Sequence, residues 1–201
     1  MIFEDNEPEG LDSSETNERE ILSLLNRYQP AEGEGYVSLF RVLDFLLEGD
    51  RWFDTNSFSD GHITGSAFIV DPRNNRTLLT HHTKLNIWVQ LGGHADGDFD
   101  IRRVAMKEAQ EESGLNHLDF ISDDIFDLDV HLIPERTGIP SHYHYDVRFL
   151  IQGDSSEKLI VSEESHDLAW VDINEIEKYT KENSVIRMCR KWTQRESGLL
   201  N

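Results

Sequence analysis

The chain contains 201 residues, of which 39 are Asp or Glu and 19 are Lys or Arg, so its formal net charge is −20. This length favours one domain with a small appendage, and no apolar run approaches the ~20 residues that would span a bilayer. The negative charge argues against binding to duplex nucleic acid or to an anionic membrane. A phosphorylated small molecule stays compatible with it, provided that a divalent cation mediates the contact.

The first residues predict neither an export signal nor a packed segment. Residues 1–20 contain eight acids and one base, with few large apolar side chains. We expect residues 1–15 to form a disordered acidic arm. The basic and apolar regions of a secretory signal are missing from the first ten residues, and the single cysteine, Cys189, is typical of a reducing compartment. These features predict a cytoplasmic protein.

Two amphipathic helices are predicted after the arm, over residues 17–28 and 36–47. Apolar residues recur at helical spacing in both, and a break with Pro30 and two glycines separates them. Neither helix could bury its apolar face alone. We therefore expect residues 16–58 to form an N-terminal helical extension of the main domain. These helices could also pack across a homodimer.

The rest of the chain alternates between strand and helix patterns. Short strands are predicted over residues 67–70, 77–80, 86–90, 128–133, 143–152 and 168–171. Helices are predicted over residues 101–113, 173–180 and 184–195. Gly92-Gly93 ends the third strand, and Gly114 ends the first of these helices in a left-handed conformation. This order favours an α+β fold in which a mixed sheet packs between helices.

A group of aspartates follows the helix over residues 101–113. Its spacing lacks the 1-3-5 pattern and the central glycine of a calcium loop. We expect a solvated surface loop that contains Asp119, Asp123, Asp124, Asp127 and Asp129.

The helix over residues 101–113 places three glutamates on one face. At 100° per residue, Glu111 and Glu112 fall about 60° and about 40° to either side of Glu108. Like charges at this spacing destabilise a helix unless something offsets their repulsion. A hard dication would offset it, whereas an ordinary solvated helix face is the alternative. Gly92 and Gly93 would let backbone carbonyls approach a metal held by this helix.

At this point the sequence resembles the Nudix hydrolase family, whose signature box is G-x5-E-x7-R-E-U-x-E-E-x-G-U, with U a bulky aliphatic residue. Six of the nine defined positions match without a gap, at Gly93, Glu108, Glu111, Glu112, Gly114 and Leu115. Three positions depart from the box, at Phe99, Lys107 and Ala109. Asp98 or Asp100 could cap the helix in place of the first glutamate. Lys107 keeps the charge of the box arginine but loses its planar fork.

The resemblance implies a Nudix-like α/β/α sandwich over residues 59–197 and hydrolysis of a diphosphate in a nucleoside diphosphate derivative or a related small molecule. It implies that Glu108, Glu111 and Glu112 are catalytic and bind Mg²⁺ or Mn²⁺, and that the carbonyl of Gly92 completes the metal site. Glu111 could instead orient the attacking water.

The resemblance also points to residues outside the helix. Family members often place the general base or another metal ligand on a later loop. Here the candidates are Glu163 and Glu164, of which we select Glu164, and a solvated loop pair is the alternative. His94 and Lys107 are the candidate substrate-binding residues, and His94 could equally be a simple loop residue.

Two further alternatives stay open. Phe99 and Lys107 are compatible with a Nudix-fold protein that binds its ligand as a sensor or regulator without efficient hydrolysis. His142, His144 and Asp146 alternate on one face of a predicted strand, which could indicate a metal site. We find no cysteine or third histidine at a suitable spacing, so these residues are interpreted as pocket lining or a polar strand face.

Overall fold

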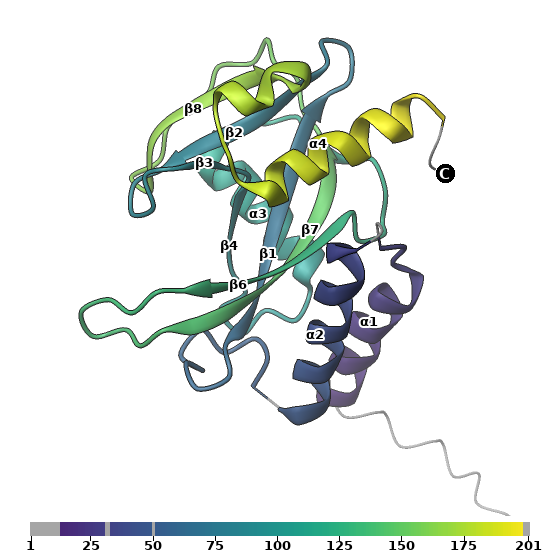
Figure 1. Cartoon of the computed structure of the whole chain (residues 1–201), viewed down its shortest axis with the longest axis vertical. Coiled ribbons are helices and arrows are strands. Elements are labelled where there is room, and N and C mark those ends of the chain that lie inside the picture. Colours follow the sequence, from purple (N-terminus) through teal and green to yellow (C-terminus); the bar gives the residue numbers. More distant parts are fainter. Residues whose placement is uncertain (1–12, 31–32, 50, 199–201) are drawn as a thin grey trace, which may run out of the picture.

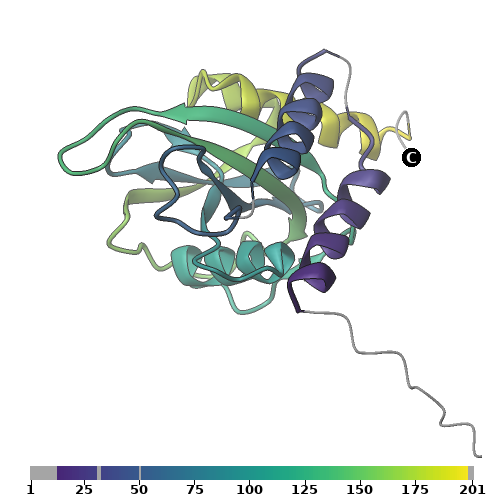
Figure 2. The same ribbon diagram turned by 90° about the horizontal axis from the view of Figure 1, so that it is seen from below.

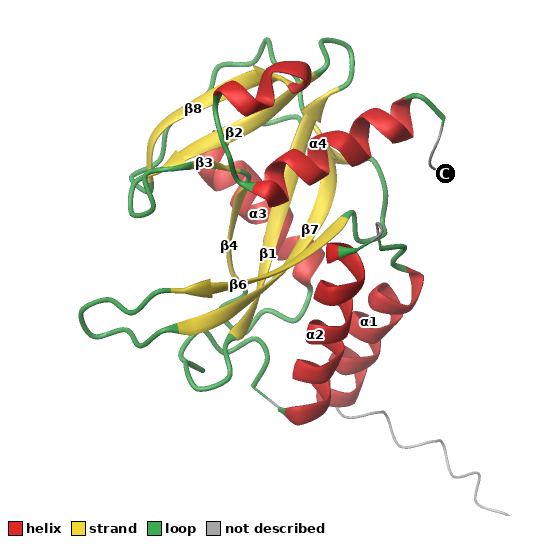
Figure 3. Ribbon diagram, in the orientation of Figure 1, coloured by secondary structure: helices red, strands yellow, loops and turns green. Residues whose placement is uncertain are grey.

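Eight strands form one mixed sheet in the computed structural model of the protein, which describes residues 13–30, 33–49 and 51–198 (Figure 1). The strands are β1 (His62–Asp71), β2 (Arg76–His82), β3 (Trp88–Val89), β4 (Leu91–His94), β5 (Asp119–Phe120), β6 (Asp127–Ile133), β7 (His142–Gln152) and β8 (Ser165–Asp172). The helices are α1 (Ser13–Arg27), α2 (Glu34–Glu48), α3 (Ile101–Ser113), the 3-10 helix η1 (Ile173–Lys178) and α4 (Asn183–Glu196). Figure 3 distinguishes these elements by type.

The two central strands, β1 and β7, are parallel, and the remaining pairs are antiparallel. β1 also pairs with β2 and β4, while β7 pairs with β5 and β6. Every residue of β1 is buried. Its mostly apolar run from Ala67 to Val70 is typical of a strand that is covered on both faces.

Helices cover both faces of the sheet, as Figure 2 shows from below. Ala67 and Ile69 of β1 pack in one apolar cluster with Ala109 of α3. Phe68 and Val70, which point to the opposite face, pack in another cluster with residues of α4. The predicted sandwich with a mixed sheet between helices is therefore confirmed.

The two N-terminal helices are present close to their predicted bounds and share a core with the sheet. Ile21 of α1 and Phe45 of α2 belong to the same apolar cluster as Ile63 of β1 and Ile101 of α3. The ring of Phe45 also stacks on Tyr145 of β7, with 3.9 Å between centroids. The helical extension thus contributes to the main core, and its boundary at residue 58 stays a prediction.

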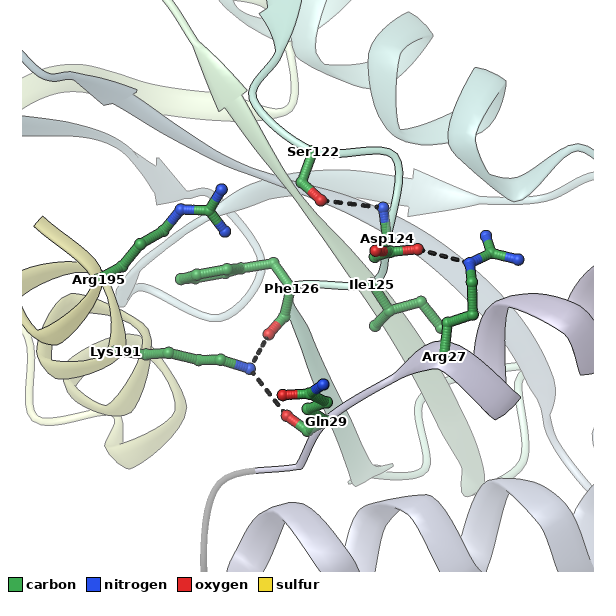
Figure 4. A pocket seen from close by; sticks show the side chains of 8 residues that line it. All are labelled: Arg27, Gln29, Ser122, Asp124, Ile125, Phe126, Lys191 and Arg195. Carbon is green, nitrogen blue, oxygen red and sulfur yellow. Dashed lines mark hydrogen bonds and ion pairs between the residues drawn. The ribbon is translucent and has the colours of Figure 1, made fainter. Parts of the chain in front are cut away.

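A small pocket marks the seam between the extension and the rest of the molecule (Figure 4). Arg27 at the end of α1 forms an ion pair of 2.6 Å with Asp124. Lys191 of α4 donates hydrogen bonds to the carbonyls of Gln29 and Phe126. The polar groups that line the pocket thus pair with one another between the helical extension and the rest of the molecule. We therefore interpret the pocket as a feature of packing.

The structure describes only the last residues of the predicted acidic arm. Residues 1–12 of the arm lie outside the described residues, whereas residues 13–15 begin α1. No helix within the described ranges is long and apolar enough to cross a membrane.

The prediction of a solvated aspartate loop was wrong for three of its five members. Asp119 lies in β5, and Asp127 and Asp129 lie in β6. The side chain of Asp127 is fully buried, and it forms ion pairs with Arg148 of β7 and Arg187 of α4. Both arginines are distant in sequence, so the run of aspartates gave no indication that these positive charges neutralise Asp127 in the fold.

Candidate active site

Helix α3 has the predicted bounds because local signals fix both of its ends. At the N-terminus, the carboxylate of Asp100 accepts a hydrogen bond of 3.0 Å from the Arg103 amide. At the C-terminus, Gly114 has a φ of 70° and donates a backbone hydrogen bond to Gln110. The helix therefore presents its glutamates in the register that the sequence predicts.

The three glutamates of α3 differ in exposure. Val104, Ala105 and other apolar residues of the helix are buried against the rest of the molecule, so the glutamates lie at the edge of this contact. Glu112 is buried, the side chain of Glu108 is 15% exposed and that of Glu111 is 61% exposed. Glu108 and Glu112 are thus the pair that is removed from solvent.

Two glycines of β4 allow this pair to approach the sheet. A Cβ atom at Gly93 would lie 2.6 Å from the carboxyl carbon of Glu108. A Cβ atom at Gly92 would lie 2.7 Å from the Cα atom of Ser66 on β1. A side chain at Gly93 would therefore displace the Glu108 carboxyl group, and one at Gly92 would push β4 away from β1. The glycine pair lies in its own strand, β4, and does not end the preceding one.

Burial and neighbouring charges raise the pKa of two carboxyl groups of the site, Glu108 and Glu112. Burial, and then the charges of Glu108 and Glu164, raise the pKa of Glu112 to about 8, while a hydrogen bond from the Gly92 backbone opposes the shift. Burial also raises the pKa of Glu108, with Glu111 and Glu164 adding to this effect. Glu164, on the loop before β8, is therefore close enough to act on both buried carboxylates.

Lys107 supplies positive charge to this group. Its Nζ lies 3.7 Å from Oε1 of Glu108 and 3.6 Å from Oε2 of Glu111. Both distances exceed the usual hydrogen-bond range, so the lysine acts as a point charge. Arg103, which is near in sequence, instead pairs with Asp98. Among the ion pairs of the described residues, none includes Glu112.

Phe99 occupies the box position of the first glutamate and makes an apolar contact there. Its ring packs edge-on against Phe53, with 5.0 Å between centroids. The neighbouring Asp100 caps α3, as the sequence suggested for Asp98 or Asp100.

His94 belongs to a group of histidines that the sequence analysis did not bring together. It follows Gly93 in β4, and its ring centroid lies 5.0 Å from that of His62 and 5.1 Å from that of His144. His62 was missed because it precedes His144 by about 80 residues, and only the parallel pairing of β1 with β7 brings them together.

The donors around Glu112 suit a hard divalent cation. Glu108, Glu111, Glu112 and Glu164 offer carboxylate oxygens, and the backbone of Gly92 lies beside Glu112, to which its amide donates a hydrogen bond. Oxygen donors of this kind favour Mg²⁺ and Mn²⁺ over softer metals. A cation would also offset the repulsion that raises the pKa of Glu112.

Comparison with known proteins identifies the family to which the chain is similar. A family model of the NUDIX domain matches residues 62–191. An m7GpppN-mRNA hydrolase from Xenopus laevis, NUDT17, is 30% identical over 128 residues, which are 57% of this chain and 43% of that relative. The chain thus aligns with less than half of the relative's length.

Two solved structures are similar in fold. An Ap4A hydrolase from C. elegans has a TM-score of 0.55 and 17% identity, with 68% of this chain and 98% of that chain covered. RenU, a Nudix hydrolase from M. smegmatis, has a TM-score of 0.52 and 14% identity, with 76% of this chain and 98% of that chain covered. At these identities the likeness concerns the fold alone.

Proposed function

The chain belongs to the Nudix hydrolase family, and from that premise we propose that it hydrolyses a pyrophosphate bond in a nucleoside diphosphate derivative or a related small molecule. The proposed cofactor is Mg²⁺ or Mn²⁺, held on the glutamate face of α3. The observation that carries this proposal is the environment of Glu112.

Glu112 is a buried carboxylate without a cationic partner among the described residues. Burial of an unpaired carboxylate is unfavourable, and here Glu108 and Glu164 add repulsion. A purely structural role would be served better by an uncharged side chain. A divalent cation bound to Glu112 would relieve this unfavourable electrostatic energy, and the energy released would contribute to the affinity for the cation.

We assign the metal to Glu108 and Glu112 together with the carbonyl of Gly92. Glu111, which is largely exposed, would serve as a further ligand or orient the attacking water. When bound, the metal would neutralise the diphosphate and lower the pKa of a coordinated water. Lys107 lies beside Glu108 and Glu111 and would contact the phosphate oxygens. His94 follows Gly93 in β4 and stays a candidate substrate-binding residue, with its side chain on the face of the sheet opposite α3.

Glu164 is our candidate for the general base or for an additional metal ligand. Its charge raises the pKa of both Glu108 and Glu112, which supports a place near the proposed metal site. Glu163 is its exposed neighbour in the same loop and provides a matched control. Glu164→Gln should lower kcat/KM at least ~10-fold, whereas Glu163→Gln should leave it within about 2-fold.

The substrate panel follows from the family and from the names of the similar proteins. A relative is named an m7GpppN-mRNA hydrolase and a structural neighbour an Ap4A hydrolase. We would therefore assay a cap analogue and Ap4A beside nucleotide sugars, ADP-ribose, NADH, CoA and nucleoside triphosphates. The net charge of −20 favours the small members of this panel over capped RNA.

The test measures product release from each compound with and without Mg²⁺ or Mn²⁺. We expect metal-dependent release from at least one compound, and Glu112→Gln should reduce it at least ~100-fold. Glu177→Gln, an exposed glutamate outside the site, is the control. Binding of a compound without turnover would contradict hydrolysis and favour the ligand-binding alternative.

A further inference from the structure

Five of the nine histidines of the chain gather on one face of the sheet. They are His62 on β1, His94 on β4, His131 on β6, and His142 and His144 on β7. The strand register explains this gathering, because His144 pairs with His62 on one side and with His131 on the other. Neighbouring side chains of paired strands are close enough to interact.

This face is opposite to the one that carries α3. A Cβ atom at Gly65 would contact Ile101 and Val104 of α3, so odd-numbered residues of this part of β1 point toward that helix. His62 therefore points away from α3. The glycines of β4 separate the histidines from Glu108, so the cluster is distinct from the carboxylate site.

Three of the histidines bring possible ligand atoms together. One ring nitrogen each of His62, His142 and His144 lies within 4.8 Å of the other two. The Nε2 atoms of His142 and His144 are 3.3 Å apart. In tetrahedral coordination with Zn–N bonds of about 2.0–2.1 Å, two ligand nitrogens lie roughly 3.3–3.4 Å apart. The two β7 histidines already have this spacing.

His62 provides an independent indication that the cluster binds a ligand. The residue is 1% exposed, and neither ring nitrogen has a hydrogen-bond partner with good geometry, the Ser57 backbone being a polar contact that acts on the ring. Buried polar groups in folded proteins are nearly always satisfied, so an imidazole with two unpartnered nitrogens requires an explanation. A metal ion shared with His142 and His144 would satisfy one of them.

The hydrogen bonds of His142 set its tautomer. Its Nδ1 lies 2.8 Å from the carbonyl oxygen of Pro140. A carbonyl only accepts, so Nδ1 carries the hydrogen, and the lone pair of Nε2 points toward Nε2 of His144, from which it can accept a hydrogen bond in the absence of a metal. Metal-binding histidines commonly donate their second ring nitrogen to a carbonyl or carboxylate in this way. His131 follows the same pattern, with Nδ1 3.1 Å from Asp129.

We propose that His62, His142 and His144 bind a divalent transition-metal ion, for which Zn²⁺ is the best match. Imidazole ligands favour Zn²⁺ over Mg²⁺, so the two sites of the molecule select different metals. Three protein ligands leave a fourth position for water or another ligand. Burial and the neighbouring imidazoles lower the pKa of His62 to about 4, which keeps this ring in the neutral form that binds metals.

Zinc binding is measured on the full chain after treatment with a chelator. ZnSO₄ is titrated calorimetrically into the wild type and into a Glu108→Gln/Glu112→Gln variant, which removes the carboxylate site. We expect one tight Zn²⁺ per chain in both proteins, in the presence of saturating Mg²⁺. Substitution by Co²⁺ should give visible absorption bands typical of tetrahedral nitrogen coordination.

Variants of the cluster separate this site from adventitious binding. His142→Gln and His144→Gln should each weaken Zn²⁺ binding at least ~100-fold, with little change in circular dichroism. His117→Gln, an exposed histidine outside the cluster, is the matched control. His62→Ala tests the third ligand, and if it fails to fold, the two β7 variants and the Co²⁺ spectrum decide.

Two results would overturn the proposal. The first is a wild-type chain that binds no Zn²⁺ tightly. The second is Zn²⁺ binding that neither His142→Gln nor His144→Gln weakens. Loss of pyrophosphate hydrolysis in Glu112→Gln has no bearing on either result, so this inference and the proposed function fail separately.

Discussion

Carboxylates gather in two regions of the molecule, and the charges that neutralise them differ. Around Arg148, whose side chain is 2% exposed, Asp127, Asp129 and Asp146 each lie within 3.4 Å of a guanidinium nitrogen. Arg187 adds a second guanidinium to Asp127 and Asp129. In this region each aspartate has an arginine, so the network is complete within the protein.

The glutamate region of α3 lacks such compensation. Lys107 lies near Glu108 and Glu111 only, at long distances of 3.7 and 3.6 Å, and no ion pair among the described residues includes Glu112 or Glu164. The pKa of Glu112 is raised to about 8 as a result of burial and repulsion. The contrast separates aspartates that are neutralised within the fold from glutamates that are candidates for binding a cation. Charge balance, more than acidity, distinguishes a structural cluster from a functional one.

The largest expected effect on stability is in the compensated region. Arg148→Met should leave Asp127, Asp129 and Asp146 without their shared cation and lower the free energy of unfolding by about 3–5 kcal/mol. Urea denaturation measures this change. Arg190→Met, at a position 74% exposed, should change it by no more than about 0.5 kcal/mol. A loss below about 1 kcal/mol for Arg148→Met would show that the network contributes little.

In the glutamate region, Gly93→Ala should lower activity and leave the free energy of unfolding nearly unchanged. The added Cβ would lie 2.6 Å from the Glu108 carboxyl group and displace it. A displacement of about 1 Å at reacting groups can cost roughly 100-fold in rate, so kcat/KM should fall between about 10- and 100-fold. Gly49→Ala, where the nearest atom is 3.5 Å away, is the control. Unchanged kcat/KM in Gly93→Ala would contradict a catalytic role for Glu108.

A third, compensated carboxylate provides a test by pH. Burial opposes the ionisation of Asp71, but hydrogen bonds from Ser155, Asn74 and Arg73 outweigh it and hold its pKa below the usual range. Because the pKa is lower in the folded state, this stabilisation is complete above about pH 4 and is lost as the pH falls below that value.

The wild type should therefore lose more free energy of unfolding between pH 7 and pH 3 than Asp71→Asn does. Urea denaturation at the two pH values measures the difference, with the exposed Asp119→Asn as control. Equal losses in the wild type and in Asp71→Asn would contradict the assignment.

The smallest effect is expected at Lys107. Lys107→Arg would place a planar fork near Glu108 and Glu111, where the lysine acts as a point charge. A gain of about 1 kcal/mol in transition-state stabilisation corresponds to roughly 5-fold in kcat/KM. Lys107→Ala should lower kcat/KM by a similar factor. If Lys107→Arg is slower than the wild type, the lysine is the better residue in this site.

Local signals made α3 predictable from the sequence. The cap at Asp100, the left-handed Gly114 and the apolar spacing all act within a few residues, so the predicted bounds of 101–113 agree with the structure. The glutamate face follows from the same helical geometry. The N-terminal helices and most strands were predictable for the same reason.

Contacts between distant segments were not predictable in this way. The ion-pair partners of Asp127 are Arg148 and Arg187, which lie 21 and 60 residues away in sequence. His62 joins His144 only through the parallel pairing of β1 and β7. The spacing of His142 and His144 along the chain identified these two residues as a pair. The register of β1 against β7 depends on the whole sheet, so the sequence did not identify His62 as their neighbour.

The central claim is that Glu112 and its neighbours hold a divalent cation. Calorimetric titration of the wild type and Glu112→Gln with Mn²⁺, together with thermal unfolding of both proteins without metal, tests it most directly. Glu112→Gln should bind Mn²⁺ at least ~100-fold more weakly and be at least as stable as the wild type, because burial of this carboxyl group, whose pKa is raised to about 8, no longer opposes folding. Unchanged Mn²⁺ affinity together with a large loss of stability would contradict the claim and make Glu112 a structural residue.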